Sequence, residues 1–141
     1  FDLHEFGLWA AELKPQVLKV PAENAKELLI KGGFIGFVGL QNVPFRSHFT
    51  PAVEVGWRLL KDAWGYGLAP EGAAIAMQDC FDRFKLAEIV AMTTTTNKNS
   101  MRVMEKLGMH RNARDDFDHP RIAEGHVLRR HVLYRISKEE W

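Results

Sequence analysis

The sequence predicts one α/β domain over residues 1–141, with helices packed on a mixed β-sheet. Three observations lead to this fold class. The chain has 141 residues, and 46% of them are hydrophobic, which is enough for one well-formed core. Segments of strand-like composition alternate with segments whose apolar residues recur at helical spacing. Their order is three strands, a helix, a strand, a helix and two strands, which differs from the regular alternation of a doubly wound sheet.

The first half of the chain supplies the three initial strands. Residues 6–13 alternate along a strand that is apolar on both faces, so we expect it to be buried on both sides. Residues 34–41 and 52–60 are rich in aromatic and β-branched side chains and form the second and third strands. A loop with a proline near each end, residues 42–51, joins them.

Residues 14–31, between the first two strands, break the strand pattern. Pro21 opens a short helix in this segment, and Gly32 and Gly33 then end it. The alternative is that the whole segment is a surface excursion.

The second half begins with a helix near Ala69. Its apolar residues are spaced by three and four, and Pro70 suits the first turn. They are Ala73, Ala74, Met77, Cys80, Phe81 and Phe84. Residues 87–96 form the fourth strand.

A second helix over residues 97–107 has N-cap oxygens on Asn97, Asn99 and Ser100, and Gly108 ends it. Residues 110–117 and 127–136 then form a closing antiparallel pair around the loop 118–126.

The composition gives no sign of a nucleic-acid or membrane partner. The chain has 19 basic and 18 acidic residues, so no strong field of either sign is expected. No apolar run reaches the roughly 18 residues that cross a bilayer, and the first residues are mixed and charged. Cys80 is the single cysteine. It lies in a helical apolar stripe, which favours a core position over a nucleophile, and a chain without disulfides fits the cytoplasm.

The most informative stretch is the turn between the third strand and the first long helix. Gly65 and Gly67 let the backbone approach a ligand, and the helix that follows presents unpaired amides to an anion. A dinucleotide fingerprint requires a third glycine where Pro70 stands, and a P-loop requires a Gly-Lys-Ser/Thr sequence that is absent. The remaining candidates are a coenzyme A pyrophosphate loop and a tight turn with no ligand.

The neighbouring segments favour the coenzyme A loop. Residues 34–40 (FIGFVGL), 53–59 (VEVGWRL), 64–71 (WGYGLAPE), 97–100 (NKNS) and 104–109 (MEKLGM) follow one another in that order. Together they resemble the GNAT superfamily of acetyltransferases, in its ribosomal-protein N-acetyltransferase branch. Residues 116–120 and 129–134 are similar to one subgroup of that branch. The resemblance implies the GNAT acyl-CoA N-acyltransferase fold, with acetyl-CoA as co-substrate and no metal.

By position, the resemblance also implies the residues that bind acetyl-CoA. The backbone of Trp57 and Leu59 bonds the pantetheine arm as an added strand, and Asn97 and Ser100 contact the arm or order the second helix. The pyrophosphate is held by the amides of Ala63, Trp64, Gly65, Tyr66, Gly67, Leu68 and Ala69.

The activity that follows is direct transfer of acetyl to a primary amine, either a protein N-terminus or a small molecule. Glu54 is the candidate base, because a carboxylate buried near the thioester has a raised pKa. The alternative is that Glu54 is a solvated or salt-bridged strand residue. The sequence departs from the resemblance at Asp62, where arginine or glutamine is usual, and at Pro70, where threonine is frequent. It also has Met104 in place of a thiolate-protonating tyrosine.

Members of this superfamily normally open with a strand and two helices before the equivalent of Phe6. The sequence therefore reads as an N-terminally incomplete domain, or as one with an open acceptor side that residues 15–31 partly cover. An unpaired sheet edge and the resemblance are both consistent with a homodimer. Without the initial elements, the alternative function is a non-catalytic coenzyme A-binding or interaction module.

A polar C-terminal region offers a further rival, a metal site. Its candidate ligands are Asp115, Asp116, Asp118, His119, Glu124, His126 and His131, but their spacing matches no familiar metal motif. Loops near an active site carry specificity, so acceptor recognition is the preferred interpretation, with His119 as its candidate residue.

Overall fold

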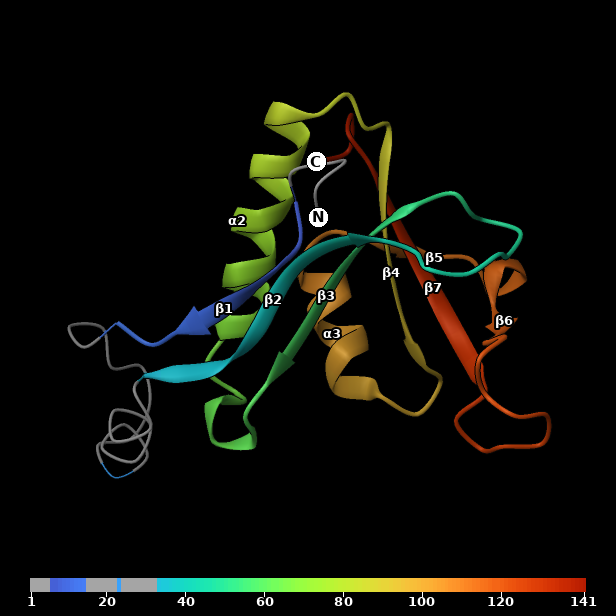
Figure 1. Ribbon diagram of the computed structural model, residues 1–141, viewed down its shortest axis with the longest axis horizontal. Coiled ribbons are helices and arrows are strands. Elements are labelled where there is room, and N and C mark those ends of the chain that lie inside the picture. Colours follow the sequence, from blue (N-terminus) through green and yellow to red (C-terminus); the bar gives the residue numbers. More distant parts are fainter. Residues whose placement is uncertain (1–5, 15–22, 24–32) are drawn as a thin grey trace.

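The computed structural model describes residues 6–14, 23 and 33–141. Within this part of the chain, seven strands form one mixed sheet in the order β1-β2-β3-β4-β7-β5, and β6 pairs with β7 (Figure 1). The strands are β1 (Leu8–Glu12), β2 (Phe34–Asn42), β3 (Val53–Leu59), β4 (Glu88–Thr94), β5 (His110–Arg111), β6 (Phe117–Asp118) and β7 (Arg130–Ser137). The helices are α2 (Leu68–Arg83) and α3 (Lys98–Lys106), with 3-10 turns η1 (Lys61–Ala63) and η2 (Ala113–Asp115).

The predicted α/β class and the order of the elements are confirmed. Both helix boundaries agree with the sequence to within a residue or two. The expected helix between Pro21 and Gly32, and the cover that residues 15–31 were expected to give the acceptor side, lie outside the described residues. No helix in the described part of the chain combines the length and the hydropathy needed to cross a membrane.

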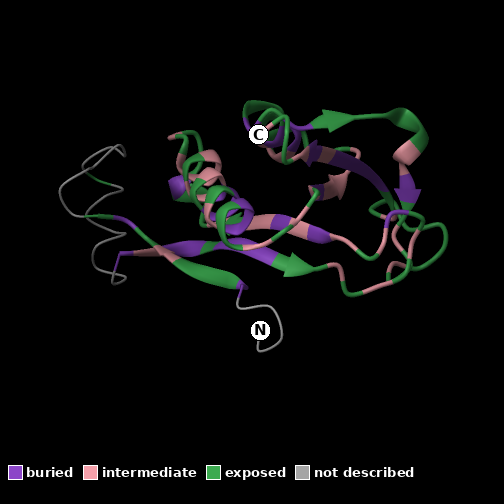
Figure 2. Ribbon diagram, turned by 90° about the horizontal axis from the view of Figure 1, so that it is seen from above, coloured by how far each residue is buried: buried purple, intermediate pink, exposed green. Residues whose placement is uncertain are grey.

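Both helices pack on the same face of the sheet, and their apolar stripes form the main core with it (Figure 2). Val38, Val55 and Ala91 turn toward Met77 and Met104 on that face. Cys80 is buried in this cluster with 1% of its surface exposed, which confirms its core position. A smaller cluster of Phe49, Val90, Phe117 and Leu133 lies on the opposite face.

The expectation that the first strand is buried on both sides is wrong. Leu8 and Trp9 remain 40% and 39% exposed, and only residues that flank β1, such as Leu13, are buried. Burial of a face depends on the elements that pack on it, and within the described residues β1 is the edge strand of the sheet, beside β2. Its register runs from Leu8↔Gly39 to Ala11↔Gly36 before an irregularity at Glu12.

The closing antiparallel pair differs from its prediction in one respect. Residues 110–117 do not form a continuous strand, because η2 interrupts them and leaves the short strands β5 and β6. Both pair with β7, at His110↔Arg135 and at Phe117↔His131. The side chain of Asn112 caps the 3-10 turn by accepting from the amide of Arg114 at 3.0 Å, a local bond that competes with the ladder.

The two central strands separate along the chain, and this positions the site. β2 and β3 pair without a shift from Gly36↔Leu59 to Asn42↔Val53. β3 and β4 run parallel and register only at Glu54↔Val90. Figure 1 shows them diverging from there toward the turn that follows β3, with α3 seen between them.

Candidate functional site

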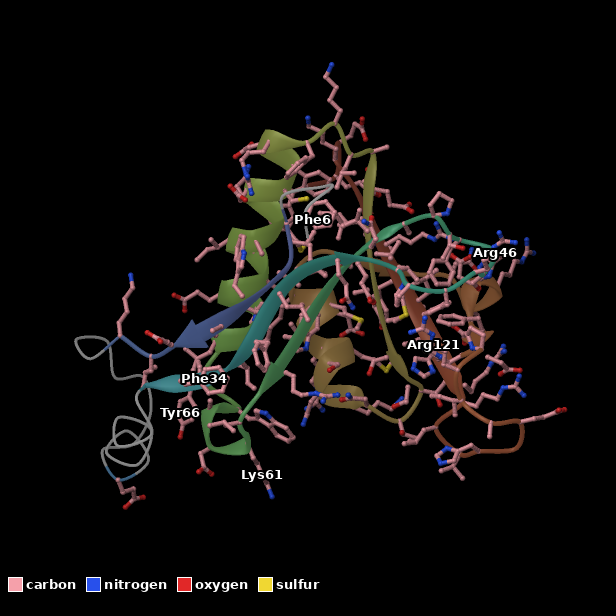
Figure 3. The ribbon with its side chains drawn as sticks, viewed as in Figure 1. Phe6, Phe34, Arg46, Lys61, Tyr66 and Arg121 are labelled. Atoms are coloured by element: carbon pink, nitrogen blue, oxygen red, sulfur yellow. The ribbon has the colours of Figure 1, made fainter. Side chains whose placement is uncertain are left out.

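The turn that follows β3 depends on two glycines in the left-handed conformation. Gly65 has φ 82° and Gly67 has φ 73°, a region that other residues enter only with strain. A Cβ atom on either glycine would have no atom within 4 Å. Backbone conformation, and not crowding, therefore requires glycine at both positions, and the turn is open on its outer side. Tyr66 and Lys61 project from this turn at the lower end of the sheet (Figure 3).

The amides of this turn are partly committed. Ala63 and Trp64 donate to the carbonyls of Leu60 and Lys61, at 2.9 and 3.0 Å. The prediction that both of these amides point at a ligand is therefore not met in this structure, because the 3-10 turn uses them. The amides that make no hydrogen bond within the described residues are those of Gly65, Tyr66, Gly67, Leu68 and Ala69.

These free amides coincide with the start of α2. Gly67 is the N-cap residue and provides no side-chain cap, so the positive end of the helix dipole is exposed together with them. An anion with several oxygens, such as a pyrophosphate, fits this set of donors. Asp62 in η1 is the one acidic residue within the turn itself.

The edge of β3 that faces away from β2 is the second element of the site. The amide of Val43 donates to the carbonyl of Ala52 at 2.9 Å, and that of Leu60 donates to Ile35 at 2.7 Å. These two bonds lie at the two ends of the β2–β3 ladder, whose register does not shift between them. The even-numbered residues of β3 therefore point their backbone N–H and C=O groups toward β2. By alternation, Trp57 and Leu59 turn theirs toward the side from which β4 has diverged. This is the arrangement that an added extended segment requires.

Two indoles hydrogen-bond to groups on that open side. Trp57 Nε1 donates to the hydroxyl of Ser100 at 3.3 Å, and Trp64 Nε1 donates to the carbonyl of Leu59 at 2.9 Å. The side chain of Asn97 accepts from the amide of Ser100 at 3.2 Å and so caps α3. The structure therefore brings together all four of the cofactor residues predicted outside the turn, and it gives Asn97 a clear structural role.

Glu54 lies at the point where β3 and β4 separate. Directly paired residues project from the same face of a sheet, so Glu54 shares a face with Gln41 and Val90, opposite the two helices. Its Oε1 accepts from Gln41 Nε2 at 2.6 Å. Burial raises the pKa of the Glu54 carboxyl, and the bond from Gln41 lowers it by less. Among described residues Glu54 has no ion pair, contrary to the salt-bridged alternative.

His119 lies on the same face of the sheet, in an aromatic cluster. Its ring centroid is 4.6 Å from that of Phe45 and 5.0 Å from that of His131. Its Nδ1 accepts from the amide of Arg121 at 3.1 Å, which leaves Nε2 as the protonated nitrogen of the neutral ring. Burial, followed by the charges of His131 and Arg121, lowers the pKa of His119.

The loop that carries His119 is fastened to the loop before β3. Arg121 donates to the carbonyl of Pro44 at 2.6 Å, and Figure 3 shows Arg121 and Arg46 on the same side of the molecule. His48 lies 3.1 Å from Asp115. The two loops therefore form one wall beside the face that carries Glu54.

Three of the carboxylates in the candidate metal set are bound to arginines. Asp115 binds Arg135, Asp116 binds Arg111 and Asp118 binds Arg130. In the part of the chain that the structure describes, no three His, Cys, Asp or Glu residues are placed to hold a metal ion. The three aspartates of this region are thus ion-paired in this structure.

Sequence reasoning missed Gln41 and Phe45. Gln41 closes a strand and Phe45 lies in a loop, and neither belongs to a motif. Their partners, Glu54 and His119, become apparent only when the register and the loop positions are known. Met104, at the position of the superfamily tyrosine, is 2% exposed within the main core.

Comparison with known proteins agrees with this geometry. The family model of the acetyltransferase (GNAT) domain matches residues 4–110. A protein of Aspergillus fumigatus named FsC-acetyl coenzyme A-N(2)-transacetylase is 34% identical over 119 residues, which cover 79% of this chain and 48% of that protein. An uncharacterized N-acetyltransferase of Bacillus subtilis, YnaD, is 32% identical over 62% of this chain and 50% of its own length. The chain thus spans about half the length of these curated relatives.

Solved structures share the fold. A GNAT-family acetyltransferase from Bacillus anthracis superimposes with a TM-score of 0.61 at 27% identity, over 78% of this chain and 62% of that one. A ribosomal-protein-alanine N-acetyltransferase from Brucella melitensis superimposes with a TM-score of 0.65 at 14% identity, over 94% of this chain and 68% of that one. The splayed central strands, the open glycine turn at the start of α2 and the family match together lead to one conclusion: this chain belongs to the GNAT acetyltransferase domain family.

Proposed function

We propose that this chain binds acetyl-CoA and transfers its acetyl group directly to a primary amine. The observation that carries the proposal is the set of free amides from Gly65 to Ala69, next to the open backbone edge of β3. The Aspergillus relative is named as an acetyl coenzyme A transacetylase, and the Bacillus subtilis relative YnaD is named as an N-acetyltransferase. Both names support an acetyl donor and an amine acceptor.

The residues would act in sequence along β3. The turn amides hold the pyrophosphate of acetyl-CoA, and the backbone of Trp57 and Leu59 bonds the amide groups of the pantetheine arm. An arm laid along this edge leads the thioester toward the Glu54↔Val90 pair, where the strands begin to separate. Backbone amides at this point would stabilise the tetrahedral oxyanion.

Glu54 would act as the base from the face of the sheet that lies opposite the two helices. It takes a proton from the ammonium form of the acceptor, directly or through a water molecule, because only the neutral amine attacks. A nitrogen–carbon bond then forms at the acetyl carbonyl, the nitrogen releases its second proton to solvent, and the carbon–sulfur bond breaks. Met104 is buried and has no proton to donate, so the thiolate leaves unassisted and takes a proton from solvent.

The direct test is thiol release from acetyl-CoA with a panel of amines: amino-acid amides, polyamines and peptides with free N-termini. We expect amine-dependent release together with an acetylated product in mass spectrometry. Binding of acetyl-CoA without turnover on any amine would contradict acetyl transfer and would instead support a coenzyme A-binding module.

A matched pair of glycine variants tests the turn. Gly67→Ala and Gly125→Ala both place alanine at a positive φ, 73° and 79°, with no atom within 4 Å of the new Cβ. Each should cost about 1–2 kcal/mol of stability from backbone strain. Only Gly67→Ala should also weaken acetyl-CoA binding, because Gly67 belongs to the proposed pyrophosphate turn and Gly125 does not. The expected loss of affinity is roughly tenfold, which corresponds to about 1.4 kcal/mol. Equal affinities in isothermal titration would exclude the turn as the pyrophosphate site.

A further inference from the structure

Gly56 is a glycine whose presence no contact with a described residue explains. It lies in the middle of β3, in the unshifted register with β2, opposite Gly39. Its φ is not in the left-handed region, and a Cβ atom built on it meets nothing within 4 Å. Glycine in a strand interior weakens the strand, and it often marks a place where a ligand approaches the backbone.

The contrast with Gly39, its partner across the strands, is informative. A Cβ atom on Gly39 would lie 2.2 Å from the carbonyl oxygen of Gly7 and 2.9 Å from the Cα of Leu8. The backbone at the start of β1 therefore covers Gly39, and packing requires glycine there. The space over Gly56 is not covered by any described residue.

The open space over Gly56 has defined borders. Glu54 and Arg58, two residues away on either side, project from the same face of the sheet as Gly56. The Gln41–Glu54 hydrogen bond forms one border, and the paired residues Phe37 and Arg58 form the other. The distance along the strand between these borders is about 13 Å, at about 3.3 Å per residue.

The remaining side opens where β3 and β4 have separated. Glu54↔Val90 is the one registered pair of these strands, so the ladder between β3 and β4 ends before Gly56. The open space over Gly56, between Glu54 and Arg58, is called the notch. It is continuous with the edge of β3 along which the pantetheine arm is proposed to lie. The carboxylate of Glu54 borders it on the acceptor face.

We propose that this notch, floored by Gly56 and bordered by Glu54 and Arg58, receives the substituent on the acceptor carbon that bears the amine. Gly56 is then a specificity-determining residue that sets how bulky this carbon can be. The inference rests on the proposed acetyl transfer and adds the class of acceptor. The acceptors are primary amines whose amine-bearing carbon can carry a substituent.

The test introduces side chains into the notch. Gly56→Ala and Gly56→Val are assayed with the best acceptor of the amine panel and with homologues that lack or add one carbon on the amine-bearing carbon. Ala10→Val is the control. Ala10 is exposed on the same face of the sheet as Gly56, but it lies on β1, where it pairs with Phe37 of β2.

We expect Gly56→Ala to lower kcat/KM for the best acceptor by roughly tenfold or more, the range for one methyl group in a specificity pocket. Gly56→Val should lower it further, and the homologue that lacks a carbon should be affected least. The Kd for acetyl-CoA should stay unchanged and the melting temperature should not fall, since the site is open and alanine suits a strand better than glycine. A loss of acceptor use without a loss of stability separates occlusion from misfolding.

Two results would overturn the inference while acetyl transfer stands. One is that kcat/KM of the Gly56 variants falls equally for all acceptor homologues, or does not fall for any, while the wild-type enzyme is active. The other is a weaker Kd for acetyl-CoA in the Gly56 variants, which would assign the space to the donor. If the wild-type chain releases no thiol with any amine, the proposed function fails, and the inference fails with it.

Discussion

The indole nitrogen of Trp57 lies 3.3 Å from the hydroxyl oxygen of Ser100, and this bond joins β3 to the first turn of α3 across the opening between β3 and β4. Trp64 makes a comparable bond, at 2.9 Å, to the carbonyl of Leu59. Both acceptors are groups proposed to contact the pantetheine arm. In this structure the two indoles thus hydrogen-bond to groups that are proposed to contact the substrate.

Ser100→Ala should lower stability and acetyl-CoA affinity together. The variant loses one partly buried hydrogen bond, worth about 1 kcal/mol, and a hydroxyl beside the proposed arm. Urea denaturation and isothermal titration measure the two effects. Asn99→Ala is the control, because Asn99 is exposed in the same helical turn and its side chain has no hydrogen-bond partner among the described residues. Matching losses in both variants would argue against a specific role for Ser100.

Acetyl-CoA binding should change the tryptophan fluorescence, mostly through Trp64. A carbonyl can accept a second hydrogen bond, but an arm at Leu59 would crowd the exposed indole that now bonds there. A titration should therefore show most of the wild-type change disappearing in Trp64→Phe. Trp9→Phe, at the exposed edge strand β1, should retain it. A full signal in Trp64→Phe would show that the arm does not reach this indole.

Glu54→Gln should reduce amine turnover and stabilise the protein at higher pH. Loss of a general base lowers kcat/KM by about a hundredfold or more. Because burial raises the pKa of Glu54 above its ordinary value of 4.5, the folded wild type is penalised as the carboxyl ionises. Its stability relative to the variant is therefore highest below that ordinary value and is lost as the pH rises through the raised pKa.

Melting temperatures and rates across pH test both statements. In the wild type, the rate should rise as Glu54 ionises, and Glu54→Gln should lack this step. Glu124→Gln removes a carboxylate from an exposed loop and serves as the control. A variant with wild-type rates at every pH would remove Glu54 as the base.

His119→Asn should reduce the loss of stability at mildly acidic pH. The pKa of His119 is lowered, chiefly by burial, so the unfolded chain binds a proton more readily than the folded one. Stability is then highest above the usual histidine pKa of about 6.5 and falls as the pH drops through it. Unfolding free energies at pH 8 and pH 5.5 measure the difference.

His126→Asn is the matched control for this prediction. The ring of His126 accepts from the amide two residues ahead at 3.0 Å, as that of His119 does, but in an exposed loop. If the two substitutions altered the pH dependence equally, the aromatic surroundings of His119 would not be the cause. A raised KM for the amine in His119→Asn alone would support acceptor recognition.

Much of the fold could be predicted because local signals agreed with it. Helical spacing of apolar residues located α2, and Asn97 and Gly108 marked the ends of α3. Gly65 and Gly67 identified the turn, because a positive φ there has almost no other solution than glycine. These features depend on neighbours in the sequence, and so the sequence contains them.

The errors arose where distant contacts decide the outcome. Residues 6–13 have the composition of a buried strand, yet β1 is an exposed edge, because burial depends on which elements cover a face. Residues 110–117 have strand-like composition, but η2 interrupts them where Asn112 caps a local turn and Arg135 of β7 binds Asp115.

The sequence by itself determined the α/β class, the positions of both helices, the glycine turn and the resemblance to a family. Only the tertiary structure decided that Ala63 and Trp64 use their amides within the turn, that Gln41 bonds Glu54, and that no described residue covers Gly56. The physical reason is that these facts depend on strand register and on the divergence of β3 from β4. Register and divergence are set by packing between residues far apart in the chain.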